Sequence, residues 1–294
     1  MPGEAAVGQS MAEREFAERR GLLYAVAYRV LGSVTEAEDV VQDTWLRWSR
    51  VDLATVSDAE GYLVRVATRL AIDRLRSARQ RRESYVGPWL PEPVLTSPDV
   101  AENVMQADSV STAMLLLLES LSPVERAVFV LNEAFGYSHA EIARFTGRSE
   151  VAVRQIAHRA RQAVGSRRRR YDADQQVRRQ VTERFLAACL GGDLNALMEI
   201  LAPDVTIVSD GGGLTGAPRK PIHGIEHVAR AIVVLARLRP AGTRAEVLAV
   251  NGGPGIVFYS GRTPVLAMTL HLVGGAVETV HVVSNPHKLH GVGP

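Results

Sequence analysis

Seven arginines between positions 154 and 170 are the strongest chemical signal in this chain. They stand at positions 154, 159, 161 and 167 to 170, and no aspartate or glutamate lies among them. Guanidinium groups neutralise phosphates, so this run indicates a surface that binds nucleic acid in a salt-dependent way. Taken on charge alone, the run could also be a solvated helix face and tail, which is the less favoured alternative.

The residues before and within this run carry the signals of three short helices. Ser122 to Glu125 form a capping box with proline at the first helical position, and Ser138 to Glu141 form a second capping box. Gly136 breaks the chain between these two helices, and Gly147 ends the second one. Ser149 is expected to cap a third helix that runs from Glu150 to about Val164.

The third helix has an apolar side and a polar side. Val153, Ile156, Ala157 and Ala160 share one face, whereas Arg154, Gln155, His158, Arg159 and Arg161 lie off it. Short helices joined by glycine turns predict a helix-turn-helix, in which the third helix directs its N-terminal residues at base edges. This combination favours a DNA-binding unit over a merely solvated face.

Length and composition limit the remaining possibilities. The 294 residues suit two domains or three small ones, and the formal net charge of +2 requires any basic function to be local. The single cysteine, Cys189, excludes an internal disulfide framework and a CxxC zinc pair. Because the sequence shows neither a membrane-spanning apolar run nor a signal peptide, we expect a cytoplasmic protein with no membrane partner, and no metal or cofactor.

Two helices are predicted near the N-terminus. The first runs from Met11 to Leu31, and the second is expected to be capped by Thr35 to Glu38. Trp45 and Trp48 lie at helical spacing on the second helix and are expected in the core. The other side of this helix carries Asp39, Gln42 and Asp43, a patch whose usual explanation is a solvated surface.

A third N-terminal helix, from Tyr62 to about Arg82, carries a second concentration of positive charge. Arg65, Arg69 and Arg76 form a basic stripe beside an apolar one, and Asp73 is the only acid in the helix. A phosphate backbone could lie along this stripe. Two basic helices separated by a linker indicate a protein that contacts nucleic acid at two places.

Residues from about Phe16 to Val164 resemble a bacterial RNA polymerase sigma factor of the extracytoplasmic-function (ECF) type. The resemblance rests on four motifs that stand in order at the usual separations: AEDVVQDTW from Ala37, YLVRVATRLAIDRLR from Tyr62, LSPVERAVF from Leu121 and HRAR from His158. It covers about half of the chain. The resemblance implies two all-α domains, a sigma-2 helical bundle over 11–83 and a sigma-4 helix-turn-helix over 111–170, joined by a proline-rich linker over 84–110.

The resemblance also implies partners and roles for residues. Core RNA polymerase would be bound through its β′ clamp helices and β flap, with Asp39, Gln42 and Asp43 on the clamp helices. The promoter would be bound at two elements. At the −10 element the matching residues are Arg65, Thr68, Arg69, Asp73 and Arg76, although many family members have asparagine in place of Thr68. At the −35 element they are Ser149, Glu150, Ala152, Arg154, Gln155, His158, Arg159 and Arg161.

After Arg170 the pattern changes to that of a small α+β domain, expected over 175–290. Helices are predicted over 177–190, 194–201 and 225–238, and strands over 205–209, 245–250, 255–259, 265–272 and 276–283. This order resembles the SnoaL-like domains, which have the cone-shaped NTF2-like fold with a curved antiparallel sheet. A subgroup of ECF sigma factors carries such a domain at its C-terminus.

Three segments match motifs of that subgroup and are expected to regulate the protein through contacts between domains. They are Trp89, Leu90 and Pro91 in the linker, the loop Asp210, Gly211, Gly212 and Gly213, and the segment Asn285, Pro286, Lys288 and Leu289. Leu214 and His287 replace a lysine and an aspartate that are usual in the subgroup. An apolar Trp-Leu pair among prolines needs burial, so we hypothesise that the linker meets one of the other two segments.

Two other functions remain possible from the sequence. The chain would be a ligand-gated helix-turn-helix regulator if the cone bound a small molecule and polymerase were not required. It would be a cyclase or isomerase with a DNA-binding anchor if Asp210, His223, His271 or His281 acted as an acid–base group in the cone. A lone strand histidine is more often structural, and the acidic helix with Asp39 argues for a polymerase surface, so we expect no reaction of its own.

Overall fold

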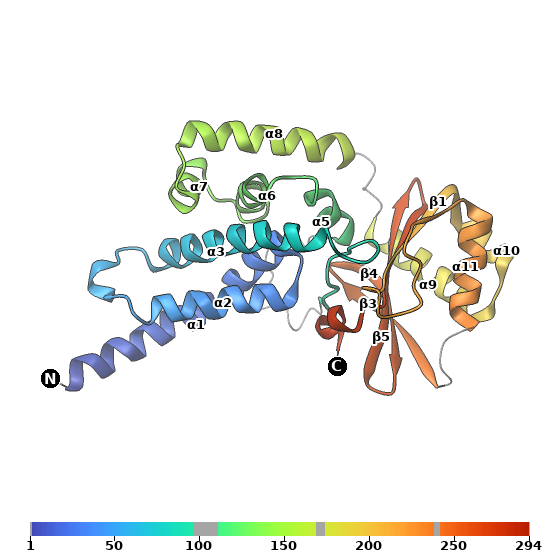
Figure 1. The fold of residues 1–294 in the computed structure, drawn as a ribbon, viewed down its shortest axis with the longest axis horizontal. Coiled ribbons are helices and arrows are strands. Elements are labelled where there is room, and N and C mark those ends of the chain that lie inside the picture. Colours follow the sequence, from blue (N-terminus) through green and yellow to red (C-terminus); the bar gives the residue numbers. More distant parts are fainter. Residues whose placement is uncertain (1, 97–110, 169–173, 238–241, 294) are drawn as a thin grey trace. The chain divides into compact units, whose positions relative to one another are not determined.

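The structure is a computed structural model that describes residues 2–96, 111–168, 174–237 and 242–293. The chain forms two compact units (Figure 1). The first comprises Met1–Arg81, Pro98–Asp108 and Leu117–Gly165, and the second comprises Arg82–Ser97, Ser109–Leu116 and Ser166–Pro294. The first part of the predicted linker therefore belongs to the same unit as the C-terminal domain. Linker residues 97–110 and the arginines at 169 and 170 lie outside the described residues.

The first unit begins with three long helices, α1 (Pro2–Leu31), α2 (Val34–Trp48) and α3 (Ala59–Arg82), with a short 3-10 turn at Leu53–Thr55. Helix α1 starts earlier than the sequence predicts. The expected cap at Thr35 to Glu38 is wrong, because the amide of Glu36 donates to the hydroxyl of Ser33 over 3.2 Å. Gly32 has a φ of 70°, which ends α1 and lets Ser33 act as the cap of the next helix at once.

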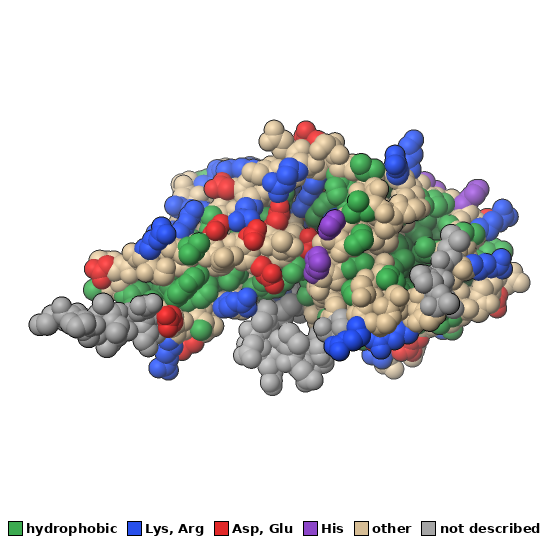
Figure 2. Space-filling model, turned by 60° about the horizontal axis from the view of Figure 1, so that its bottom comes forward, with side chains coloured by type: hydrophobic (Ala, Val, Ile, Leu, Met, Phe, Trp, Pro, Cys, Tyr) green, Lys and Arg blue, Asp and Glu red, His purple; other side chains and the backbone are tan. Residues whose placement is uncertain are grey.

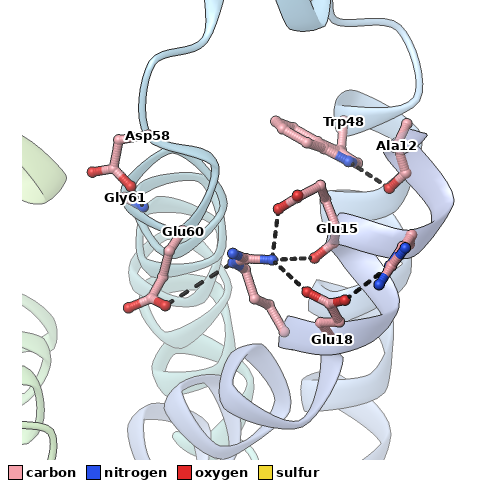
Figure 3. Close-up of polar contacts among 9 residues, drawn as sticks. Ala12, Glu15, Glu18, Trp48, Asp58, Glu60 and Gly61 are labelled. Carbon is pink, nitrogen blue, oxygen red and sulfur yellow. Dashed lines mark hydrogen bonds and ion pairs between the residues drawn. The ribbon is translucent and has the colours of Figure 1, made fainter. Parts of the chain in front are cut away.

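Helices α1 and α2 pack through aromatic side chains (Figure 3). The indole of Trp48 is buried, and its Nε1 donates to the Ala12 carbonyl over 2.9 Å. Trp45 is half-buried, with its ring 5.1 Å from that of Phe16. The expectation that both tryptophans belong to the core is therefore confirmed for Trp48, while Trp45 lies at the edge of the core.

The helix-turn-helix follows, and its part from Leu117 to Gly165 lies in the same unit. It contains α5 (Thr112–Leu118), α6 (Pro123–Phe129) continued by a π-turn (Val130–Ala134), α7 (His139–Thr146) and α8 (Glu150–Arg168). Both predicted capping boxes are confirmed, since the side chains of Ser122 and Glu125, and of Ser138 and Glu141, exchange hydrogen bonds with the helix-start amides. Gly147 has a φ of 67° and ends α7, so that Ser149 can cap α8.

The second unit contains a six-stranded sheet with helices on one side of it (Figure 1). Its helices are α9 (Gln175–Gly191), α10 (Leu194–Ile200) and α11 (Ile225–Arg237). Its strands lie in the order β2-β1-β6-β5-β4-β3. They are β1 (Leu201–Asp210), β2 (Ile222–His223), β3 (Thr243–Val250), β4 (Gly253–Ser260), β5 (Thr263–Val273) and β6 (Ala276–Val283).

The predicted α+β architecture with a curved sheet is confirmed, with one correction. The sheet is mixed and not antiparallel throughout, because β1 pairs with β6 in parallel, Ile207 facing Val280. Strands β3 to β6 form an antiparallel meander, and its last strand returns beside β1. The two-residue strand β2 was not predicted, since so short a segment carries no alternation.

The two faces of the sheet bury different partners. One face, with Ile256, Met268 and Val282, packs against the helices. The other face, with Val257, Ala267 and Val283, packs against Leu90 of the linker and against Leu289 and Val292 near the C-terminus. The linker thus supplies part of a hydrophobic core. Within the described part of the chain, no helix is both long and apolar enough to cross a membrane.

Candidate nucleic-acid interface and linker site

Acidic and basic side chains are interspersed on the face of the molecule shown in Figure 2, in keeping with the small net charge. A nucleic-acid surface must therefore be built from local groups. Helix α8 provides one such group. Its apolar side, with Val153, Ile156 and Ala160, is buried, while every residue predicted at the −35 element is exposed except Ala152, which is half-buried.

Several of the α8 arginines already have partners within the unit. Arg154 pairs with Glu150 one turn earlier on the same helix. Arg161 contacts the π-turn after α6, with 2.6 Å from its Nε to Glu133 and 2.9 Å from its Nη2 to the Asn132 side chain. Arg159 lies 3.6 Å from Glu125. Among the described residues, Arg154 is paired only within its own helix, whereas Arg159 and Arg161 hold α8 against α6 and its π-turn. The side chains of the arginines from 167 on are not described.

Two exposed residues at the start of α8 were missing from the predicted −35 set. Val151 is 64% exposed beside Glu150 and Arg154, and Arg148 is exposed in the turn before the helix. Val151 could have been found from the sequence, because an apolar residue on the otherwise polar side of this helix has no place in the core. An exposed aliphatic group there suits contact with a thymine methyl group.

Helix α3 presents its basic stripe less uniformly than predicted. Arg69 and Arg76 are exposed, and Arg76 pairs with Asp73 over 2.9 Å. Arg65 is half-buried and stacks its guanidinium 5.0 Å from the centre of the Tyr62 ring. The stripe therefore exists as a surface, but part of its charge is internally paired.

Thr68 departs from the predicted −10 set. Its side chain is 0% exposed, and its hydroxyl has no hydrogen-bond partner among the described residues. The residue faces the core of the helical bundle because it shares the apolar side of α3 with Val64 and Ala71. A direct contact of Thr68 with a promoter base does not fit this placement.

We expect Thr68→Val to raise the free energy of unfolding by about 1 kcal/mol, because it removes a buried hydroxyl that forms no hydrogen bond. Promoter-specific transcription should stay at the wild-type level. Denaturant unfolding and run-off transcription measure the two effects. A loss of transcription without a loss of stability would place Thr68 at the promoter after all.

The acidic side of α2 is organised by one arginine that the sequence did not single out. Arg74 on α3 donates from Nη1 to Asp39 over 2.8 Å and from Nη2 to Asp43 over 2.7 Å. Burial lowers the pKa of Arg74, but the hydrogen bonds to Asp43 and Asp39 raise it above its ordinary value. The side chains of Asp39 and Asp43 remain partly exposed to solvent, and Gln42 beside them is exposed.

Helices α1 and α3 contact the helix-turn-helix through arginines that donate to backbone carbonyls. Arg69 donates to Phe145 at the end of α7 over 3.0 Å, and Arg79 donates to the Glu119 carbonyl over 3.0 Å and to that of Leu121. Arg126 on α6 is fully buried, pairs with Glu119 and donates to the Arg29 carbonyl of α1 over 3.2 Å. Part of the basic stripe of α3 is therefore engaged within the unit.

In the second unit, Asp210 at the end of β1 receives the linker. Its carboxylate is 0% exposed and accepts from the Leu90 amide over 2.8 Å and from the Tyr85 hydroxyl over 2.5 Å. Lys288 donates to the same carboxylate over 2.6 Å and to the Leu90 carbonyl over 2.7 Å. Asn285 donates to the Tyr85 hydroxyl over 2.9 Å. We call Asp210, Asn285 and Lys288, with their linker partners Tyr85 and Leu90, the linker site.

The hypothesised contact of the linker with the other two segments is thus present, and it involves both of them. Tyr85 was missed, because it lies before the motif that suggested the contact. The rings of Tyr85 and Trp89 lie 5.0 and 4.1 Å from the Lys288 ammonium, which places a cation beside two aromatic faces. Pro91 is buried beside Leu90, whereas Pro286 and His287 are exposed.

The glycines after Asp210 allow the linker to approach closely. A Cβ on Gly212 would lie 2.3 Å from the Asn285 amide, and one on Gly213 would lie 3.1 Å from Val86. Gly212 and Gly213 also have φ angles of 59° and 74°, which side chains disfavour. Leu214 is 59% exposed and makes no part of the linker site.

The buried charge of Lys288 in the linker site makes the free energy of unfolding depend on pH. Burial lowers the pKa of Lys288 to about 8 from its ordinary value of 10.5, although Asp210 opposes the shift. Between those two values the unfolded state binds more protons at this residue than the folded state, so the contribution of Lys288 to the free energy of unfolding rises with pH. We expect the difference between wild type and Lys288→Met in urea unfolding to grow across this window. A difference that stays constant would contradict the shift.

The four candidate acid–base residues do not gather at one site. The register of β5 and β6 pairs Thr269 with His281 and Ala267 with Val283, which puts His281 and His271 on the linker-facing side of the sheet and not inside the cone. They line a space of about 40 Å³ beside Thr112, and burial lowers the pKa of each to about 4. His223 is exposed, and Asp210 is occupied by the linker. Among the described residues, no group of three or more His, Cys, Asp or Glu side chains is arranged to hold a metal ion.

Comparison with known proteins identifies two sigma-factor regions in the helical part of the chain. Residues 16–82 match the family model for sigma-70 region 2, and residues 111–164 match that for sigma-70 region 4. The chain is 37% identical to the ECF RNA polymerase sigma factor SigJ of Mycobacterium tuberculosis over 94% of this chain and 93% of that protein. It is 30% identical to the ECF RNA polymerase sigma factor SigG of the same species over 90% of this chain and 78% of that protein.

The crystal structure of SigJ is also similar, with a TM-score of 0.74 and 33% identity over 96% of this chain and 98% of that chain. The similarity extends through the C-terminal unit as well as the helical one, since nearly the whole of both chains is covered. The chain therefore belongs to the ECF RNA polymerase sigma factors, the alternative sigma factors that bind core RNA polymerase and promoter DNA and direct transcription initiation.

Proposed function

We propose that this sigma factor acts in the cytoplasm without a reaction of its own and places its surfaces on polymerase and promoter as follows. The exposed acidic side of α2, with Asp39, Gln42 and Asp43, binds the β′ clamp helices, and the helix-turn-helix contacts the β flap. Helix α3 engages the −10 element, and the N-terminal part of α8 binds the −35 element in the major groove. The predicted residues on α2, α3 and α8 are exposed or half-buried, apart from the buried Thr68, and this placement supports these assignments.

We infer that promoter binding requires the contacts between α3 and the helix-turn-helix to break. Arg69 and Arg79 of α3 donate to carbonyls at Phe145, Glu119 and Leu121 of the helix-turn-helix. A DNA strand that uses these guanidinium groups competes with those carbonyls, so the helix-turn-helix has to move away from α3. Charge-assisted hydrogen bonds to phosphate are stronger than those to neutral carbonyls, which favours the exchange.

The C-terminal domain regulates the sigma factor in cis by holding the linker. A single observation carries this proposal: the buried Asp210 carboxylate accepts hydrogen bonds from the backbone amide of Leu90 and the hydroxyl of Tyr85. The linker joins the −10-binding and −35-binding domains, so its anchoring restricts how these domains can separate. The linker also pairs with the end of β3, where the Leu95 backbone bridges that of Val250.

Two proposals, the sigma role and the regulation through the linker site, are tested by run-off transcription. The assay uses purified core polymerase and the promoter region upstream of the protein's own gene. Specific transcripts from the full chain, or from a version ending at Arg170, would support the sigma role, and their ratio would show whether the last domain activates or restrains. In the full chain, Asp210→Asn with Lys288→Met removes the ion pair and should change transcript yield about five-fold or more. The control is Lys220→Met, since Lys220 is exposed and is the only other lysine. Equal yields from the double variant, the control and wild type would disprove regulation through the linker site.

A further inference from the structure

The helix-covered face of the sheet encloses a cavity of about 620 Å³ that the linker site does not use. Its walls come from α9, β1, α11, β4, β5 and β6, with Cys189, Ile207, Phe258 and Met268 among the lining residues. Protein interiors are packed nearly as densely as organic crystals, with few voids larger than a water molecule. A cavity of this volume falls instead in the range of about 300 to 1,000 Å³ found for small-molecule sites.

The described lining of this cavity carries no charged side chain. No Asp, Glu, Lys, Arg or His is among the described residues that line it, and the majority are aliphatic or aromatic. An ionised ligand would lose its hydration there without gaining a partner, which is strongly unfavourable. Burial raises the pKa of the Cys189 thiol to about 12, so this wall offers a neutral sulfur and not a thiolate.

Apart from the Cys189 thiol, the polar side chains of the described lining are hydroxyls, and three of them lie at the end of the cavity next to Asp210. Ser209 precedes Asp210 on β1, and the hydroxyls of Thr215 and Ser284 lie 2.9 Å apart. Ser284 also donates its amide to the Asp210 carbonyl over 2.9 Å. Hydroxyls both donate and accept, so this end suits a hydroxyl or carbonyl group of a ligand. At the rim, Val234 and Leu235 of α11 are 53% and 37% exposed, which leaves an apolar entrance.

We propose that the cone binds an uncharged, largely apolar small molecule that carries a hydroxyl or carbonyl group, with this group at Ser209, Thr215 and Ser284. The remainder of the molecule lies between α11 and the inner face of the sheet. The proposal concerns binding and holds independently of how the linker site regulates transcription. It assigns no reaction to the cavity, because Asp210, His223, His271 and His281 all lie outside its lining.

The test uses the full-length protein and the neutral fluorophore N-phenyl-1-naphthylamine, whose emission rises in apolar surroundings. We expect saturable binding, and we expect Ala231→Phe to weaken it by about ten-fold or more, since Ala231 lines the cavity on α11 and a phenyl group there fills it. Arg230→Phe is the matched control. It places the same side chain one residue away, at an exposed position outside the lining. Ala236→Phe, at another lining residue of α11, serves as a second blocking variant if the first unfolds at a lower temperature than wild type.

Competition distinguishes the chemical class. The alcohol 1-decanol should displace the fluorophore at a concentration about ten-fold or more below that needed for decanoate or decylammonium, because only the alcohol enters without a charge. Ser284→Ala should lower the affinity for 1-decanol. It should leave the affinity for the fluorophore, which has no hydroxyl, unchanged. Non-saturable binding, equal binding to the blocking variants and wild type, equal displacement by the charged compounds, or an unchanged affinity of Ser284→Ala for the alcohol would each overturn the proposal.

Discussion

We expect Asp210→Asn to lower the free energy of unfolding of the second unit by about 3 to 5 kcal/mol, because removing one member of a buried ion pair leaves the other charge without compensation. The Asp210 side chain is fully buried and the Lys288 side chain is 7% exposed, so water does little to screen the loss. Asparagine retains one acceptor oxygen, but it cannot satisfy Lys288, Leu90 and Tyr85 together. Urea unfolding followed by circular dichroism measures the change.

The double variant Asp210→Asn with Lys288→Met separates the pair from the packing around it. Neutralising both partners removes the unpaired charge, so the double variant should unfold at a higher urea concentration than Asp210→Asn alone. Lys220→Met, at an exposed position, should match wild type. Single variants at Asp210 and Lys288 that both stay within about 0.5 kcal/mol of wild type would show that the linker site is not an energetic anchor.

The elements that sequence predicted best are those fixed by local chemistry. Ser122 and Glu125, like Ser138 and Glu141, sit three residues apart, and a hydroxyl and a carboxylate at that spacing satisfy helix-start amides whatever the rest of the fold does. In the same way Gly147, in the left-handed region, ends α7. These interactions can be predicted from sequence because they join residues within one turn of the chain and do not depend on how the rest of the protein packs.

The wrong cap of α2 and the parallel pairing of β1 have different causes. Ser33 and Thr35 are both capping residues with a glutamate three positions on, and only the position of Gly32 decides between them. The direction of a strand pair depends on where the chain returns after α11 and three further strands. Alternation along β1 and β6 is the same in either direction, so sequence pattern does not determine it.

The functional-site residues show the same contrast between local pattern, which sequence reveals, and tertiary packing, which it does not. The exposed side of α8 could be predicted from helical periodicity, whereas the burial of Thr68 could not be derived from its place in a family motif. Tyr85 and Arg74 were missed because each matters through a partner far along the chain, Asp210 and the Asp39–Asp43 pair. Only three-dimensional packing brings such groups together.

Helix α2 provides a sharp test of the proposed polymerase surface. We expect Asp39→Lys with Asp43→Lys to weaken binding to core polymerase by about 100-fold, since reversed charges on an interface bring like charges together. Glu38→Lys is the matched control, an exposed acid on the same helix but outside the proposed docking set. Binding is measured by fluorescence anisotropy of labelled sigma factor with purified core polymerase.

Arg74 complicates this test and also makes it decisive. Reversing Asp39 and Asp43 leaves Arg74 facing two lysines, so the double variant loses internal ion pairs as well as the acidic surface. Adding Arg74→Glu restores pairing within the protein with the opposite polarity, and should recover the stability lost by the double variant, about 1 kcal/mol for such partly exposed pairs. If the acidic side of α2 is the docking surface, the triple variant still fails to bind polymerase. If the triple variant binds as wild type does, Asp39 and Asp43 serve only to hold α3, and polymerase docks elsewhere.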